Sequence, residues 1–151
     1  MLFKTTALAS EFFRIHPELR RVLFGLDAKI DEWNFPSLTL THLHRTLDQQ
    51  EDFKWRRFAK QGLAEPEART KARRLFSWHL ADCGVDFRRH IYEPAQLREI
   101  RAWIYERCPS PMWEFIDEEE GGTAPHFHLA RQDFTWRQRY ERDTGKSTGA
   151  T

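Results

Sequence analysis

The stretch SWHLADCGVDF, residues 77–87, holds the most informative pattern of this chain. His79 and Asp86 stand seven residues apart in it, with Gly84 between them as the residue best suited to a turn. The residues after Gly84, VDFRRHIY, alternate apolar and polar side chains, which is typical of a strand. A histidine that enters a turn and an aspartate on the strand that leaves it can converge on one point.

A second stretch, PHFHL at 125–129, places His126 and His128 at alternate positions of a predicted strand. Side chains two positions apart on a strand face the same side. Imidazole and carboxylate groups are typical ligands of catalytic zinc sites, which keep a fourth position for water. Together the two stretches predict a zinc site. The alternative is that each histidine is an ordinary core or surface residue with a hydrogen bond.

Apolar spacing predicts the remaining elements. Steps of three and four residues predict helices over 18–33, 47–62, 65–74 and 94–107, and alternation predicts strands over 37–45, 85–92, 111–117 and 125–130. The acidic link EEEGGTA, residues 118–124, can join the last two strands as a hairpin. We therefore expect an α+β fold in which helices cover an antiparallel sheet. One domain over residues 1–136 would be followed by a polar tail, 137–151, that frays.

Composition limits the classes of partner. The 24 basic and 23 acidic side chains nearly cancel, so no wide field attracts nucleic acid or an anionic membrane. The basic residues within 69–74, near several aromatics, leave a nucleic-acid-binding protein as an alternative, although such a helix is more often a solvated face. No stretch reaches the roughly 18 apolar residues of a membrane span. The two cysteines, Cys83 and Cys108, are expected as reduced thiols.

The chain resembles the zinc D-alanyl-D-alanine carboxypeptidases and L-alanyl-D-glutamate endopeptidases, the peptidase M15 family, whose fold is shared with the hedgehog signalling domain. The family pattern is S-x-H-x-x-G-x-A-x-D, followed later by H-x-H or E-x-x-H, and preceded by a strand that ends in arginine. The matching positions are Ser77, His79, Asp86, His126, His128 and, in LTLTHLHRT, Arg45. The resemblance covers about residues 38–130 and implies a hedgehog/DD-peptidase-like fold.

Three positions depart from the family pattern. Asp82 stands where the family has glycine, and Gly84 stands where it has alanine. Pro125 occupies the place of the glutamate that serves as general base in the E-x-x-H members. His126 is then the nearest substitute for that base, as in the H-x-H members. The acidic residues Glu114, Asp117 and 118–120 are expected to form a solvated strand end and loop, with the alternative that one of them reaches into the site.

The resemblance implies a zinc-dependent peptidase that hydrolyses D-amino-acid-containing peptides of bacterial peptidoglycan, as a carboxypeptidase or an endolysin-like endopeptidase. It implies His79, Asp86 and His128 as zinc ligands, His126 as the base and Arg45 as the group that binds a substrate carboxylate or carbonyl. Ser77 would orient a ligand or the turn, and His42 and His44 are further candidates to line the cleft.

The expected partner is a peptidoglycan stem peptide or a D-amino-acid dipeptide, and not a nucleic acid. The first residues do not form the apolar core of a signal peptide, so we expect a cytoplasmic protein or one released by a phage lysis route. The alternative function is a non-catalytic zinc-binding module of the same fold, which the missing glutamate favours.

Overall fold

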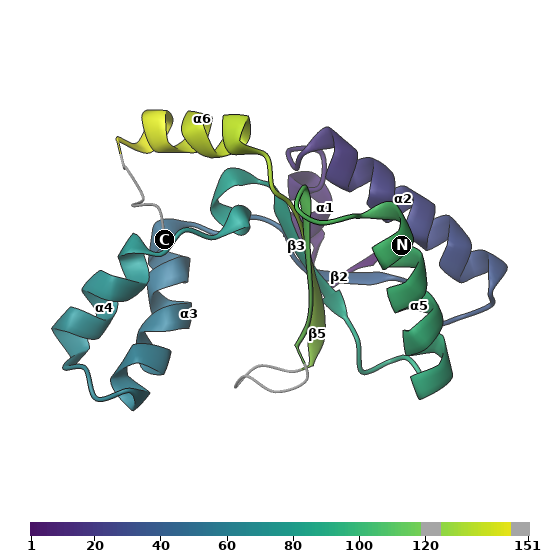
Figure 1. Cartoon of the computed structure of the whole chain (residues 1–151), viewed down its shortest axis with the longest axis horizontal. Helices are drawn as coiled ribbons and strands as arrows, with labels where there is room; N and C mark the ends of the chain where they lie inside the picture. Colours follow the sequence, from purple (N-terminus) through teal and green to yellow (C-terminus); the bar gives the residue numbers. More distant parts are fainter. Residues whose placement is uncertain (119–124, 146–151) are drawn as a thin grey trace.

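The computed structural model describes residues 1–118 and 125–145, which form an α+β protein (Figure 1). The strands are β1 (Leu2–Phe3), β2 (Thr39–His42), β3 (Gly84–Arg88), β4 (Trp113–Glu118) and β5 (His126–Arg131). The helices are α1 (Thr6–Glu11), α2 (Pro17–Glu32), α3 (Leu47–Lys60), α4 (Glu65–Arg74), α5 (Pro94–Arg107) and α6 (Phe134–Thr144), with a 3-10 turn, η1 (Trp78–Ala81). Helices α4 and α5 confirm the predicted ranges to the residue.

Local capping explains where two of these helices begin. The Thr46 hydroxyl accepts the Gln49 backbone N–H at 3.2 Å, and the Gln49 amide oxygen accepts the Thr46 N–H at 2.8 Å. This reciprocal pair satisfies donors that the first turn of α3 leaves unpaired. Helix α5 begins with the same kind of box at Glu93 and has Pro94 in its first turn, where a missing N–H costs nothing.

The five strands are ordered β1-β2-β3-β5-β4. Strands β2, β3, β5 and β4 pair antiparallel, as predicted, and β4 with β5 confirms the expected strand pair. The link between them falls on residues 119–124, outside the described part. The sheet as a whole is mixed, because β1 runs parallel to β2, with Leu2 opposite Thr39. A strand of two residues is too short to show an alternating pattern, which is why the sequence did not reveal it.

The main core lies between the sheet and helices α2 and α5, which Figure 1 shows on one side of the strands. In β3 and β5 the apolar neighbours of Asp86 and His128 point into this core. They are Val85, Phe87, Phe127 and Leu129, each with none of its surface exposed. Each such side chain contributes about 2 kcal/mol by leaving water. Because side chains alternate along a strand, Asp86 and His128 lie on the opposite face.

Helices α3 and α4 form a hairpin that packs on itself. Phe58, Ala68 and Ala72 make a small core of its own, separate from the main one. Ion pairs from Arg69 and Arg73 to Glu51 fasten the two helices together. Figure 1 shows this hairpin on the side of the sheet opposite to α2 and α5. It therefore forms a wall beside the face that carries Asp86 and His128.

The expected fraying tail from residue 137 is wrong for the residues up to Thr144, which belong to α6. The Asp133 carboxylate caps this helix by accepting the N–H of Thr135 at 2.8 Å, and it also lies 3.1 Å from Nε2 of His16. Trp136 and Tyr140 pack against the cluster around Trp78. No residue of α6 is fully buried, so its apolar stripe is too weak to read from the sequence. Residues 146–151 lie outside the described part.

Two further expectations concern the cysteines and membrane-spanning helices. Cys83 and Cys108 are both free and buried, which confirms the prediction of reduced thiols. Within residues 1–118 and 125–145, no helix has the length and apolarity to cross a bilayer.

Candidate metal centre

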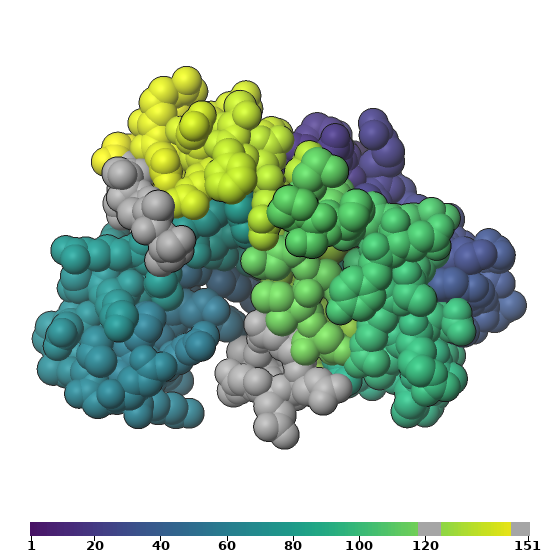
Figure 2. All heavy atoms as spheres, viewed as in Figure 1, coloured from purple at the N-terminus to yellow at the C-terminus, as the bar shows by residue number. Residues whose placement is uncertain are grey.

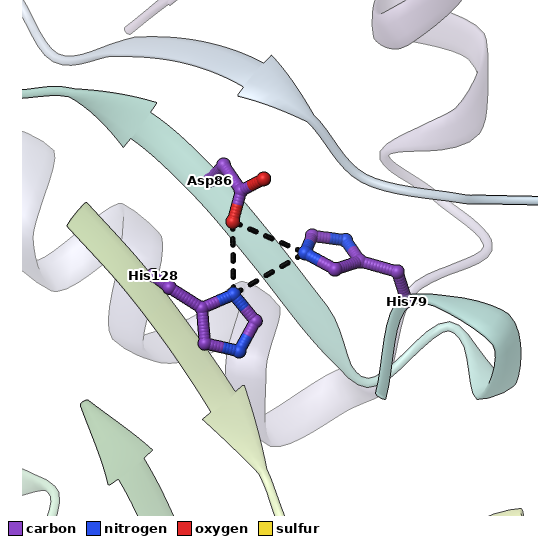
Figure 3. Close-up of side chains that lie close together, drawn as sticks. All are labelled: His79, Asp86 and His128. Atoms are coloured by element: carbon purple, nitrogen blue, oxygen red, sulfur yellow. Dashed lines mark hydrogen bonds and ion pairs between the residues drawn. The ribbon is translucent and has the colours of Figure 1, made fainter. Parts of the chain in front are cut away.

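Three side chains predicted as zinc ligands meet at one point (Figure 3). Nε2 of His79 lies 3.1 Å from Oδ1 of Asp86, and that oxygen lies 2.8 Å from Nδ1 of His128. The two ring nitrogens are 3.2 Å apart. Together the three ligand atoms form a group that could hold a metal ion.

The sheet register and a tight turn bring these residues together. Asp86 on β3 is directly opposite His128 on β5, so their side chains project side by side from the same face. His79 belongs to η1, which leads back into β3. One reversal of the chain direction between η1 and β3 is therefore enough to place His79 beside Asp86 and His128.

The reversal takes place at Asp82, which adopts a left-handed conformation with φ 55° and ψ 26°. Glycine favours this region, and aspartate is among the few other residues that tolerate it. The Asp82 carbonyl accepts the His16 N–H at 2.8 Å, and its carboxylate lies 2.7 Å from Nδ1 of His44. These contacts hold the turn in its left-handed conformation.

Gly84, where the family pattern has alanine, sits tightly against His79. A Cβ at this position would lie 3.0 Å from the His79 backbone nitrogen and 3.2 Å from its ring. The missing side chain therefore permits the close approach of the ligand to β3.

The protonation of His79 suits a metal ligand. Its Nδ1–H donates to the carbonyl of Leu43 at 2.9 Å, since a carbonyl oxygen can only accept. Burial lowers the pKa of His79 and keeps the ring neutral. Nε2 then presents a lone pair to Asp86, and a carbonyl partner on the other nitrogen is the usual support of a metal-binding histidine.

The charges around Asp86 also suit a cation. Burial opposes its ionisation, but His79 and His128 hold its pKa well below the usual range, so the carboxylate is charged. Burial likewise favours neutral His128, but Asp86 and Glu114 outweigh this and raise its pKa to about 9. The proton on His128 thus places positive charge beside Asp86. A divalent cation bound there would displace this proton and supply the positive charge instead.

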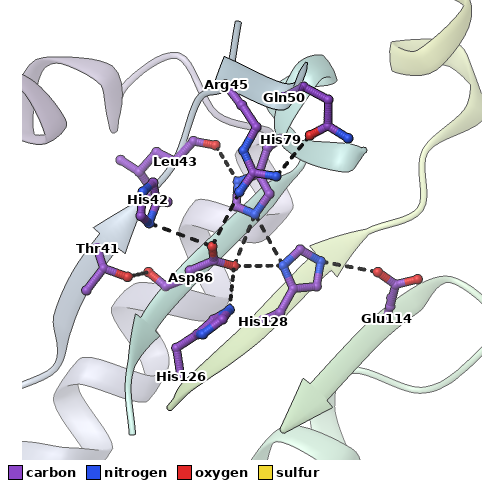
Figure 4. Close-up of polar contacts among 10 residues, drawn as sticks. All are labelled: Thr41, His42, Leu43, Arg45, Gln50, His79, Asp86, Glu114, His126 and His128. Atoms are coloured by element: carbon purple, nitrogen blue, oxygen red, sulfur yellow. Dashed lines mark hydrogen bonds and ion pairs between the residues drawn. The ribbon is translucent and has the colours of Figure 1, made fainter. Parts of the chain in front are cut away.

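Arg45, which the resemblance implies as a substrate-binding residue, lies beside this group (Figure 4). It is buried, with Nη2 3.9 Å from Oδ2 of Asp86 and Nη1–H donating to the Gln50 side-chain oxygen at 3.0 Å. Its guanidinium stacks over the Phe53 ring at 4.8 Å. His42 approaches the same Asp86 oxygen at 3.8 Å. Arg45 is therefore held by residues of α3 and lines the cleft.

Glu114, for which the sequence favoured a solvated role, reaches the site. Its Oε1 lies 3.2 Å from Nε2 of His128, on the side of the ring away from Asp86. The hydrogen bond from His128 lowers the pKa of Glu114, so the carboxylate is charged. The expected solvated role is thus wrong for Glu114. A signal existed: Trp113 and Phe115 on either side face the core, which turns Glu114 to the site.

The structure places the other acidic and polar candidates in different surroundings. Asp117, also expected in solvent, pairs with Arg89 and Arg101. His44 lies beyond the end of β2 and contacts Asp82, so it does not share a strand face with His42. Ser77 precedes η1 and lines the cleft, but its hydroxyl does not cap that turn. Its role in orienting a ligand stays a prediction.

The centre opens into a cleft of about 380 Å³, which the α3–α4 hairpin borders on one side and β4 and β5 on the other. Figure 2 shows the surface hollowed between the hairpin and the strands. His126 lines this cleft, with Nε2 3.9 Å from Oδ1 of Asp86. A volume of about this size is within the usual range of small-molecule binding sites.

No family model, curated protein or solved structure matches this chain. The described residues bring together, around one cleft, three side chains that could hold a metal ion, a histidine beside them and a buried arginine.

Proposed function

We propose that this protein is a zinc-dependent peptidase that hydrolyses D-amino-acid-containing peptides of bacterial peptidoglycan. The observation that carries the proposal is the convergence of His79, Asp86 and His128, whose ligand atoms all lie within 4.8 Å of one another. Two imidazole nitrogens and one carboxylate oxygen are a donor set of catalytic zinc sites, whereas structural sites have four protein ligands. The resemblance of residues 38–130 to the peptidase M15 family and its hedgehog/DD-peptidase fold supports a peptide substrate.

The residues fit a zinc ion once His128 gives up the proton on its Nδ1, which the cation would replace. His79 presents a lone pair because its other nitrogen donates to Leu43, and Asp86 is ionised. Oδ1 of Asp86 and Nε2 of His79 lie 3.1 Å apart, and the proton on His128 supplies positive charge beside them. A cation at this point would satisfy both.

The chain supplies the groups that peptide hydrolysis needs. Bound zinc would polarise the scissile carbonyl and acidify water. We assign His126 as the base that takes a proton from the attacking water and passes it to the leaving amine. This assignment is supported by its place in the cleft, 3.9 Å from Asp86. Arg45 would orient a substrate carboxylate or carbonyl through its planar guanidinium.

Glu114 would act through His128 and not on the substrate. A carboxylate that accepts the second N–H of a ligating histidine fixes the ring and strengthens the ligand. The 3.2 Å contact on the far side of the ring supports this positioning role.

Two measurements test the proposal. We expect one zinc ion per chain in the purified protein and little in His128→Ala. We then expect the zinc-loaded protein to cut muropeptides, with products identified by mass spectrometry and cutting abolished by a chelator. No zinc in the native protein, even after incubation with the metal, would refute the site.

The second candidate, a non-catalytic zinc module, is favoured by one observation: Pro125 occupies the place of the family glutamate. Bound zinc without cleavage of any muropeptide would select it.

A further inference from the structure

Among the described residues, His44 and Asp82 line a second cavity and not the cleft of the metal centre. His44 nevertheless reaches the turn that carries the ligand His79, because it contacts Asp82. We infer that His44 is a positioning residue for the metal: through Asp82 it holds the left-handed corner of this turn, and thereby it sets the affinity of the site for zinc. This inference rests on the zinc site of the proposed function and names a residue on which that site depends.

The corner of the turn is a conformation that most side chains avoid. Asp82 has a φ of 55°, and the one other residue besides glycine with a positive φ in the described part of the chain is Asn34, with 56°. In this region the Cβ crowds the following carbonyl oxygen. A residue with a side chain therefore stays there only when surrounding contacts hold it.

Contacts on both its side chain and its backbone hold Asp82. The Nδ1–H of His44 donates to Oδ1 across 2.7 Å, since a carboxylate can only accept. The carbonyl of Asp82 accepts the His16 N–H at 2.8 Å. The exposed fractions of the His44 and Asp82 side chains are 26% and 20%, so their hydrogen bond is largely shielded from water and is stronger for it.

The contact with Asp82 is one of three that adjacent residues make with this turn. The carbonyl of Leu43 accepts the Nδ1–H of His79 at 2.9 Å, and the N–H of Arg45 donates to the His79 carbonyl at 3.3 Å. These two contacts orient the ring and the backbone of His79. His44 lies between Leu43 and Arg45 in the chain and holds the residue at which the turn reverses. Loss of its imidazole would therefore loosen the turn at the point where His79 is returned to the other two ligands.

The contact from His44 is needed only because residue 82 has a side chain. Glycine has no Cβ and adopts the left-handed region about as readily as the right-handed one. In Asp82→Gly the corner would keep its shape without help from His44. The effect of removing His44 should thus depend on which residue occupies position 82, whereas a general loss of packing would be the same in both cases.

A double-mutant cycle tests this dependence. Zinc affinity is measured by competition with a chelator for the native protein, His44→Ala, Asp82→Gly and the variant that carries both changes. We expect His44→Ala to lower zinc affinity about tenfold, in the range found when the support of a ligand is removed. Asp82→Gly should bind zinc nearly as tightly as the native protein, and adding His44→Ala to it should cause no further loss.

Matched variants separate an effect on the turn from an effect on overall stability. Asp82→Ala and Asn34→Ala each place an alanine at a left-handed position, but Asn34 follows α2, the helix that covers the other face of the sheet. Both should unfold at a lower urea concentration than the native protein, and only Asp82→Ala should lose zinc affinity. The exposed His90→Ala is the control for His44→Ala and should change neither property.

Three results would overturn the inference. They are unchanged zinc affinity in His44→Ala, an equal loss when His44 is removed from the native protein and from Asp82→Gly, and a loss of zinc affinity in Asn34→Ala as large as that in Asp82→Ala. Its failure is distinguishable from that of the proposed function. Zinc binding with the expected cycle but without cleavage of any muropeptide refutes only the peptidase, whereas cleavage by a protein whose cycle is additive refutes only the inference.

Discussion

The backbone carbonyl of Leu43 accepts the Nδ1–H of His79 across 2.9 Å, and this hydrogen bond turns the lone pair of Nε2 toward Asp86. The contact joins the loop after β2 to the turn before β3. The orientation of the His79 lone pair therefore depends on how closely this turn packs against β3, and hence on Gly84.

Gly84→Ala should weaken zinc binding. The new Cβ would come within 3.0 Å of the His79 backbone nitrogen, so the ligand must move by a few tenths of an ångström. We expect zinc affinity to fall about tenfold, in the range found when the support of a ligand is disturbed. Competition with a chelator measures it. Gly25→Ala is the control, since its Cβ meets Trp103 at an ordinary 3.4 Å. Unchanged zinc affinity would show that the turn adapts freely.

Glu114→Gln should also lower zinc affinity, by about tenfold, because the amide keeps the shape of the side chain but loses the charge that orients His128. The same chelator competition measures this change, with the exposed Glu99→Gln as the control. Should zinc affinity stay the same while cleavage is lost, Glu114 would act on the substrate and not through His128.

His126→Ala separates catalysis from metal binding. His126 lies beside the three ligands but is not among them, so the variant should keep its zinc. Loss of the base should lower kcat by about two to four orders of magnitude. Zinc content and muropeptide cleavage are measured for this variant and for the control His90→Ala, at an exposed position. Retained activity would remove His126 from the role of base.

Asp133 should make the contribution of α6 to the stability of the protein depend on pH. Burial alone would raise its pKa, but bonds from His16 and from two backbone N–H groups outweigh this and lower it from 3.8. A carboxyl with a depressed folded-state pKa stabilises above its unfolded pKa, and this contribution is lost as pH falls through the folded value. Asp133→Asn should therefore destabilise the protein near neutral pH, and less so in acid.

Urea unfolding at neutral pH and at a pH of about 3 measures this difference. The control is Asp143→Asn, at an exposed position of the same helix. A gap between native and Asp133→Asn protein that stays constant with pH would contradict the assignment.

Much of what the sequence alone predicted depends on residues that are close together in the chain. Helices α4 and α5 were predicted over their observed ranges because apolar spacing, proline and capping residues act within a few positions of one another. Residue type and spacing within two short stretches predicted a zinc site, the family resemblance implied which three groups are its ligands, and the structure brings these three together. Helix α6 was missed because its two anchoring aromatics are only partly buried against distant residues.

Only the tertiary structure decided what surrounds the ligands. Glu114 reaches His128 because β4 lies next to β5, and strand order cannot be read from alternation along one strand. Arg57, Arg74 and Arg137 share a cleft because the α3–α4 hairpin and α6, which is distant from it in the sequence, both border it. Residue type and short spacing determine which groups can bind a metal or an anion. The long-range packing of the chain decides which of them face one another, since that packing depends on the burial of apolar faces and not on the polar residues themselves.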